Sequence, residues 1–276
     1  MAHRPIITLT TDFGINDHFV GAMKGVILDI VPEAAIVDIS HAVQAFDVLD
    51  GALAISQAYS YFPVRTVHVV VVDPGVGTTR RPILASSDGY HFVAPDNGVL
   101  SMVYAREERI QVRHITSEHY FRQPVSNTFH ARDVFAPVAA YLAKMVDSHK
   151  FGDEIEDYVR FAAPKPKATG ENRMRGVVLK VDKFGNLITN VTPNDVPTLF
   201  SAKPAPFKIV LGSREITAIH SAYAEGTPGE VFGILGSMGY LEIAANRASA
   251  AQLTGAGKGA EVNIQLQGAT AAGTGQ

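Results

Sequence analysis

The chain of 276 residues contains no cysteine. This absence excludes disulfide bonds, thiolate metal sites and cysteine nucleophiles, so any chemistry must come from oxygen and nitrogen groups. Long apolar runs are also missing: the start, MAHRPIITLTTDFG, has no signal-peptide core, and no segment approaches the roughly 20 apolar residues of a membrane span. We therefore expect a soluble, cytoplasmic protein without a membrane partner.

An excess of charge of either sign is missing as well. The 24 basic and 27 acidic residues give a formal net charge of −3, and no stripe of basic residues interleaved with aromatics occurs. Nucleic acid is therefore not an expected partner. The composition, 46% hydrophobic and 18% charged, is typical of a compact globular protein, and the length favours two domains of roughly 100 to 200 residues.

Residues 1–163 alternate short β-branched runs with helical periodicity, which is typical of parallel strands joined by crossover helices. This pattern predicts an α/β sandwich domain with a mainly parallel sheet. The predicted strands are Ile6 to Thr10, Ala35 to Ile39, Thr66 to Val72 and Ile110 to Ile115. The predicted helices are Asp17 to Val31, capped by Asp17, then Asp47 to Tyr61 and Ala131 to Met145.

A proline-rich, polar stretch without periodicity, residues 164–174, predicts an interdomain linker. Residues 175–267 contain short strands separated by turn residues, which predicts a smaller antiparallel β-barrel-like domain. We expect the small, polar residues 268–276 to form a flexible tail. The strands predicted in the second domain are Gly176 to Val181, Leu187 to Val191, Phe207 to Leu211, Arg214 to Ile219, Val231 to Leu235, Tyr240 to Ala244 and Val262 to Gln265.

Asp12 follows the first predicted strand, at the sheet edge where open α/β folds bind ligands. An ionised carboxylate accepts hydrogen bonds through both oxygens, so Asp12 is a candidate for binding two vicinal ribose hydroxyls. On position alone, a turn-forming aspartate explains the residue equally well.

A sharper pattern follows the third predicted strand, where Asp73 opens the loop DPGVGTT and Arg80 comes seven residues later. The loop lacks the Gly-Lys-Ser/Thr ending of a phosphate loop and the third glycine of a dinucleotide motif. A carboxylate at a buried strand end is costly unless it is paired or functional. Asp73 and Arg80 are therefore either a structural ion pair or part of a reactive site.

His130 lies at the entrance of the helix predicted from Ala131. A histidine there can accept a proton near neutral pH, although the helix dipole disfavours its charged form. A single histidine is more often structural than catalytic. A catalytic role requires that Asp73 and Arg80 lie beside it.

Two turns of the second domain carry further candidate residues. In DKFGN, Phe184 suits stacking on a purine, Asn186 suits pairing with its edge, and Asp182 suits an ammonium group. A hairpin turn at Gly185-Asn186 explains the same letters. Ser237, in the segment GSMG, likewise lies in a predicted strand–turn–strand.

Taken in order, these motifs resemble the S-adenosylmethionine (SAM) hydroxide adenosyltransferase family, hydrolytic relatives of the bacterial fluorinase and chlorinase. The resemblance runs from Thr10 to about Leu253 and rests on TDFG, DHFVGAMKGVI, VDISH, VDPGVGTTRR, APDNG, TFHARDVFAP, DKFGNLITN and GSMGYLEIAANRASA. Each motif alone is weak, whereas the ordered set is highly specific.

The resemblance implies hydrolysis of S-adenosyl-L-methionine to adenosine and L-methionine by SN2 attack of an activated water at C5', with no metal and no cofactor. It implies a homotrimer with each ligand between the first domain of one subunit and the second domain of a neighbour. The motifs assign Asp73, Arg80 and His130 to catalysis, Asp12 to the ribose hydroxyls, Phe184 and Asn186 to adenine, and Asp182 and Ser237 to the methionine end.

The sulfonium leaves as a neutral thioether and needs no general acid, so the requirement is a competent nucleophile. We expect Asp73 and His130 to position and deprotonate a water while Arg80 holds the carboxylate and the developing hydroxide. General-base help of this kind is worth about 100- to 10,000-fold. Two residues depart from the family pattern: Ala131 replaces a usual glycine, and Met238 stands where fluorinase-like enzymes carry an arginine.

Three alternatives stay open at this point. The first is a SAM-dependent halogenase of the same superfamily, which the triad disfavours because fluorinase-like members lack it. The second is a metal-dependent hydrolase built on Asp12, Asp73 and His130, although no HExxH helix or other dense ligand motif occurs. The third is a protein that binds SAM or a nucleoside without turnover.

Overall fold

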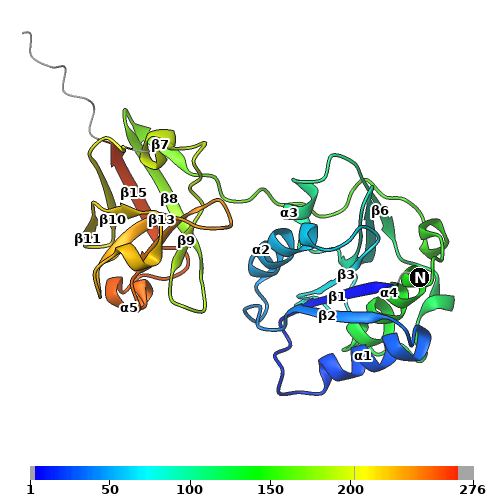
Figure 1. Cartoon of the computed structure of the whole chain (residues 1–276). Helices are drawn as coiled ribbons and strands as arrows, with labels where there is room; N and C mark the ends of the chain where they lie inside the picture. Colours follow the sequence, from blue (N-terminus) through cyan, green and yellow to red (C-terminus); the bar gives the residue numbers. More distant parts are fainter. Residues whose placement is uncertain (1–3, 202, 267–276) are drawn as a thin grey trace, which may run out of the picture. The chain divides into compact units, whose positions relative to one another are not determined.

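The computed structural model describes residues 4–201 and 203–266 and is a mixed α/β structure with two β-sheets. The chain divides between Ala163 and Pro164 into two compact units, each with its own sheet (Figure 1). No helix within the described ranges combines the length and apolar character that a membrane span requires.

In the sheet of the first unit, one strand runs opposite to the others. Its strand order is β2-β1-β3-β5-β4-β6, in which β1, β2, β3 and β5 run parallel, whereas β4 is antiparallel to both β5 and β6. The strands are β1 (Ile6–Thr11), β2 (Ala35–Ser40), β3 (Val67–Val71), β4 (Pro82–Ser87), β5 (His91–Pro95) and β6 (Ile110–His114).

The reversed strand β4 corrects the sequence-based prediction. The hairpin of β4 and β5 was not predicted, whereas β6, which is antiparallel to β4, has the same direction as β5. The physical reason is the short turn, residues 88–90, because a connection of this length joins only antiparallel strands.

Helices cover both faces of this sheet (Figure 1). Side chains of β3 alternate between the two faces: Val69 packs in the cluster with α1 and α4, and Val70 packs in the opposite cluster with α2. The helices are α1 (Phe19–Ile30), α2 (Val48–Ala58), α3 (Ser101–Tyr104) and α4 (Ala136–Ala143).

The helix starts differ from the predictions in two places. Asp17 does not cap α1, since His18 occupies the N-cap position and makes no side-chain capping bond. The helix predicted from Ala131 starts with a π-helical turn, Ala131–Phe135, before α4 continues it. π-helical turns are rare in proteins, but those that occur often lie at functional sites. This one begins immediately after His130.

The second unit is built on one curled sheet that forms a half-barrel. Its order is β11-β10-β15-β8-β9-β14-β13-β12 with β7 beside β8, and β11 also contacts β13 although the two are distant along this order. Neighbouring strands are antiparallel except β12 and β13. The elements are β7 (Lys167–Gly170), β8 (Arg173–Val181), β9 (Leu187–Thr189), β10 (Phe207–Leu211), β11 (Arg214–Ile216), β12 (Ile219–His220), β13 (Val231–Leu235), β14 (Leu241–Ala245), α5 (Ala250–Thr254) and β15 (Glu261–Leu266).

Part of the predicted linker, residues 164–174, is a strand. β7 pairs with β8 through a hairpin, with Lys167 opposite Arg175. Every residue of β7 is exposed, so no apolar alternation marks the strand in the sequence. The predicted tail, residues 268–276, lies outside the described residues.

His68 is a buried histidine in the middle of β3. Its Nδ1 lies 2.7 Å from Thr8 Oγ1, its Nε2 has no hydrogen-bond partner, and the rings of Tyr59, Tyr90 and Phe92 surround it. Burial lowers the pKa of His68 to about 3. The folded state therefore keeps this ring neutral at pH values where an unfolded chain would protonate it.

We expect acid to destabilise the fold through His68. Above pH 6.5 both states carry a neutral ring, and between pH 6.5 and about 3 only the unfolded state binds the proton, so stability falls as pH falls. Urea unfolding of wild type and His68→Phe from pH 7 to pH 4 should show their stability difference changing by about 1.4 kcal/mol per pH unit. The exposed His119→Gln control should keep the wild-type slope, and parallel pH curves for wild type and His68→Phe would refute the assignment.

Candidate active site

Asp12 and Asp73 emerge at the same edge of the first sheet. Strands β1 and β3 are parallel neighbours with Thr11 opposite Val71, and the two aspartates follow directly beyond these ends. The side-chain amide of Asn97 donates a hydrogen bond to the Val72 carbonyl at 2.8 Å and holds the end of β3 in place. The carboxyl edge of a parallel sheet is the usual ligand-binding edge of such folds.

Arg80 joins Asp73 to His130. Its Nε donates to Asp73 Oδ1 at 3.1 Å, its Nη2 donates to Asp73 Oδ2, and the same Nη2 lies 3.1 Å from His130 Nδ1. The side chains of Asp73 and Arg80 are 5% and 6% exposed. The structure thus brings together the three residues that the motifs assign to catalysis, with the guanidinium at the centre.

This contact determines which nitrogen of His130 carries the proton. A guanidinium has no acceptor, so His130 Nδ1 must accept the hydrogen bond from Arg80. The neutral ring then carries its proton on Nε2, where it is a donor. His130 cannot accept a second proton while this contact persists, so the expectation that it deprotonates water requires revision.

The environment shifts both titratable groups of this cluster. Burial raises the pKa of the Asp73 carboxyl, and the attraction of Arg80 opposes that rise. Burial and the nearby Arg80 charge lower the pKa of His130. The lowered pKa of His130 keeps its imidazole neutral, and the raised pKa of Asp73 makes its carboxylate a stronger base.

Two loops that are distant in sequence bring His130 to Arg80. Gly77 has φ +75° and lies so close to the Asn127 carbonyl that an added Cβ would be 2.1 Å from its oxygen. On the other side, the fully buried Asp133 accepts from the Ser126 amide at 2.9 Å and from Arg132 Nε at 2.7 Å. The role of Asp133 was not predicted from the sequence, where the available signal is an acidic residue in the first turn after the histidine.

Asp12 keeps one oxygen free of contacts within the described chain. Its Oδ2 accepts from the Phe46 amide at 2.9 Å, and Phe46 has a left-handed backbone with φ 65°. His41 holds the same loop, since its carbonyl accepts from Gly14 at 2.7 Å and its Nδ1 lies 2.8 Å from Thr11 Oγ1. Neither Phe46 nor His41 was identified from the sequence, because both depend on contacts between residues about 30 positions apart.

The candidate residues of the second unit occupy two turns. Asp182 Oδ1 accepts from the amides of Phe184 at 2.9 Å and Asn186 at 2.8 Å, and its Oδ2 accepts from the Asn186 side chain at 2.9 Å. Phe184 is 78% exposed, and Ser237 is exposed in the turn between β13 and β14. The hydrogen bonds of Asp182 form the hairpin turn itself, as the structural interpretation of DKFGN anticipated.

Across the described ranges, no three His, Asp or Glu side chains are grouped so as to hold a metal ion. Asp12, Asp73 and His130 therefore do not form such a group. The polar contacts of Asp73 and His130 are instead directed at Arg80.

Comparison with protein families gives a match to each unit. The model of the SAM hydroxide adenosyltransferase N-terminal domain matches residues 7–152, and that of the C-terminal domain matches residues 176–263. The chain belongs to the SAM hydroxide adenosyltransferase family. The N-terminal match contains the whole Asp73, Arg80 and His130 cluster, and the C-terminal match contains both turns of the second unit.

Individual members of the family and its relatives agree with this membership. A protein from Salinispora tropica named (R)-S-adenosyl-L-methionine hydrolase is 36% identical, over 96% of this chain and 99% of its own. A protein from Nocardia brasiliensis named fluorinase is 29% identical over 95% and 97%. The crystal structure of an uncharacterised conserved protein from Thermotoga maritima superposes with a TM-score of 0.87 at 35% identity, covering 94% of this chain and 99% of that one.

We expect Gly77→Ala to separate the two loops of the cluster. The added Cβ meets a backbone oxygen, and the left-handed conformation alone costs about 1 to 2 kcal/mol. Activity should fall at least tenfold, and the melting temperature should fall with it. The control is Gly21→Ala in α1, where a Cβ meets nothing within 4 Å and an alanine favours the helix; equal activity of the two variants would contradict the packing role of Gly77.

Proposed function

We propose that this chain hydrolyses S-adenosyl-L-methionine to adenosine and L-methionine without a metal or a cofactor. The observation that carries the proposal is the buried guanidinium of Arg80. Its Nη2 contacts Asp73 and His130, while its Nη1 is buried without a hydrogen-bond partner. An unpaired buried donor is costly, and a water or hydroxide beside Asp73 would satisfy it.

The reaction balances without a general acid. A lone pair of the water oxygen forms the bond to C5' of the ribose as the C5'–S bond breaks. The electron pair of the C5'–S bond stays on sulfur, which turns the sulfonium into the neutral thioether of methionine. One proton of the water must leave. Attack by an anionic oxygen on a sulfonium neutralises charge, so it proceeds better where bulk water is excluded.

In this proposal the Asp73 carboxylate accepts the proton, and His130 Nε2–H donates a hydrogen bond that orients the water. The raised pKa of Asp73 makes it a better base, and the lowered pKa of His130 keeps its ring neutral. Arg80 holds both groups and directs Nη1 at the developing hydroxide. This assignment keeps the three catalytic residues of the motif and moves the basic role to Asp73.

The remaining motif residues would bind the substrate. Asp12, with one free oxygen, is assigned to the ribose hydroxyls, and the exposed ring of Phe184 with Asn186 is assigned to adenine. Asp182 and Ser237 are assigned to the methionine end. The α/β sandwich unit would then act as the catalytic domain, and the barrel-like unit would recognise the two ends of the substrate.

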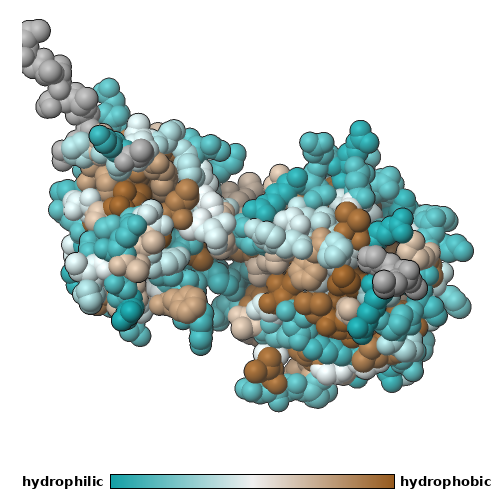
Figure 2. All heavy atoms as spheres, viewed as in Figure 1, coloured by the Kyte–Doolittle hydropathy of each residue, from teal (hydrophilic) through white to brown (hydrophobic). Residues whose placement is uncertain are grey.

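We also propose that the chain works as a cytoplasmic homotrimer with its sites at subunit interfaces. Hydrophobic surface gathers on the visible face of the α/β unit (Figure 2). Exposed apolar surface of this kind is typical of interaction sites. Sedimentation equilibrium tests the assembly, since the mass of a single chain at working concentrations would contradict it. The large apolar side chains with the greatest exposure are Ile15, Phe46, Tyr61, Val64, Met145 and Phe184.

The function is tested by turnover in 18O-labelled water. We expect label in the 5'-hydroxyl of adenosine, methionine in equal amount, and full activity in the presence of a chelator. Added chloride should yield no 5'-chloro-5'-deoxyadenosine. A chlorinated product would favour the halogenase, loss of activity in chelator would favour the metal-dependent hydrolase, and tight binding without any product would favour a SAM-binding protein.

The division of roles predicts a particular pH profile. Because Asp73 must be ionised, kcat should fall as pH falls through its pKa, at a pH above the usual aspartate range near 4. Asp73→Asn should lower kcat by about 100- to 10,000-fold. His130→Gln keeps an N–H donor and should retain much more activity than His130→Ala, with KM nearly unchanged in both. If both His130 variants lose kcat equally, His130 acts as the base and the division of roles fails.

A further inference from the structure

Glu242 is a buried carboxylate without a positively charged partner. It lies in β14 and is 5% exposed. Its Oε2 accepts a hydrogen bond from the Tyr223 hydroxyl at 3.0 Å, whereas its Oε1 accepts none from the described residues. Within residues 4–201 and 203–266, no lysine, arginine or histidine forms an ion pair with it. Buried charges are normally paired, so this site lacks a cation.

The surroundings of Glu242 increase the local negative charge. Burial, and after it the charge of Asp182, raise the pKa of Glu242, while the Tyr223 hydrogen bond opposes the rise. Burial together with Glu242 raises the pKa of Tyr223 to about 12, so the hydroxyl remains protonated and keeps donating. A cation bound here would relieve the repulsion between the two carboxylates.

Glu242 lies between the two turns assigned to the methionine end. It is opposite Ile188 of β9, the strand that follows the Asp182 turn. Its carboxylate also lies against Gly236, since a Cβ on that residue would be 1.8 Å from Oε1. Gly236 directly precedes Ser237, and any side chain on residue 236 would overlap the Glu242 carboxylate as it is placed here.

Asp182 is less available for a ligand than its sequence context suggested. Both of its oxygens accept hydrogen bonds from the turn that it forms, two of them from backbone amides. Glu242 Oε1 is the carboxylate oxygen of the pair that accepts no such bond. The direct contact with a cationic ligand group is therefore better made by Glu242, with Asp182 adding negative charge.

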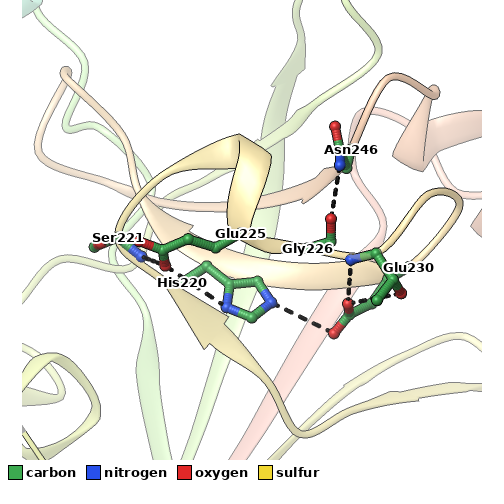
Figure 3. Close-up of polar contacts among 7 residues, drawn as sticks. His220, Ser221, Glu225, Gly226, Glu230 and Asn246 are labelled. Carbon is green, nitrogen blue, oxygen red and sulfur yellow. Dashed lines mark hydrogen bonds and ion pairs between the residues drawn. The ribbon is translucent and has the colours of Figure 1, made fainter.

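The segment around Tyr223 is held by polar contacts of its neighbouring residues. The Glu225 carboxylate accepts from the amide and hydroxyl of Ser221 at 3.0 and 2.6 Å, and the Asn246 side chain donates to the Gly226 carbonyl at 2.6 Å (Figure 3). His220 lies between Glu225 and Glu230, with its Nε2 3.4 Å from Glu230 Oε1. These contacts fix the short turn that carries Tyr223, and through it the orientation of the Glu242 carboxylate.

We infer that Glu242 binds the α-ammonium group of the amino-acid part of the substrate and is a specificity-determining residue, with Tyr223 as its positioning residue. An ammonium group supplies three donors and the charge that the two carboxylates lack. The inference rests on the proposed function. The competing interpretation is that Glu242 is a neutral acid that only braces the sheet.

The test compares Glu242→Gln with Glu261→Gln, an exposed glutamate of the same unit, on two substrates. One substrate is S-adenosyl-L-methionine, and the other is its analogue with hydrogen in place of the α-amino group. For Glu242→Gln we expect KM for S-adenosyl-L-methionine to rise roughly 10- to 100-fold with kcat little changed, because a hydrogen bond to a charged group is lost. KM for the analogue should stay at the wild-type value, and Glu261→Gln should match wild type on both.

Tyr223→Phe provides a second variant that keeps the carboxylate and the ring. Its KM should rise for S-adenosyl-L-methionine and not for the analogue, by a smaller factor than in Glu242→Gln. Equal effects on the two substrates, or no effect on either, would overturn the inference and leave Glu242 a structural acid. Absence of product from wild-type enzyme would instead refute the proposed function, so the two failures are distinguishable.

Discussion

The guanidinium of Arg80 holds the candidate active site together. Asp73 follows a buried strand and His130 stands at the start of a helix 57 positions further along the chain, and both side chains contact Arg80. Removing one partner of a buried ion pair leaves an uncompensated charge and is strongly destabilising. The same contact therefore stabilises the loops and determines where each proton of the site resides.

The architecture around Arg80 follows from this requirement. The parallel strands β1 and β3 deliver two aspartates to one sheet edge, whereas the reversed strand β4 lies further along the sheet, between β5 and β6. Gly77 lets the His130 loop lie close to the Asp73 loop, because it has no side chain. Asp133 stabilises the His130 loop by accepting a hydrogen bond from the Ser126 amide. In the second unit the pattern is reversed, because Glu242 lacks the cation that Arg80 supplies to Asp73. One carboxylate has its counter-charge built into the protein, and we infer that the other receives it from the ligand.

Much of the fold was predictable where strands are apolar and turns carry glycine. The strand at Phe207–Leu211 lies at the bounds expected, and the buried run through β3 was recognised from the four consecutive valines Val69 to Val72. The predictions failed where pairing depends on partners rather than on local pattern. The exposed β7 and the hairpin of β4 and β5 both depend on which strands lie beside them.

By itself the sequence determined the family, because an ordered set of eight motifs is far more specific than any one of them. It also indicated which residue types stand at the ends of strands and helices, since periodicity and turn residues are local signals. Only the tertiary structure decided that Arg80 lies between Asp73 and His130, which makes the Nε2–H of the imidazole a hydrogen-bond donor. Only the tertiary structure decided, too, that both carboxylate oxygens of Asp182 accept hydrogen bonds within its own turn, whereas one oxygen of Glu242 accepts none from the described residues. Hydrogen-bond direction and counter-charge depend on distances between residues far apart in the chain, and no local pattern encodes them.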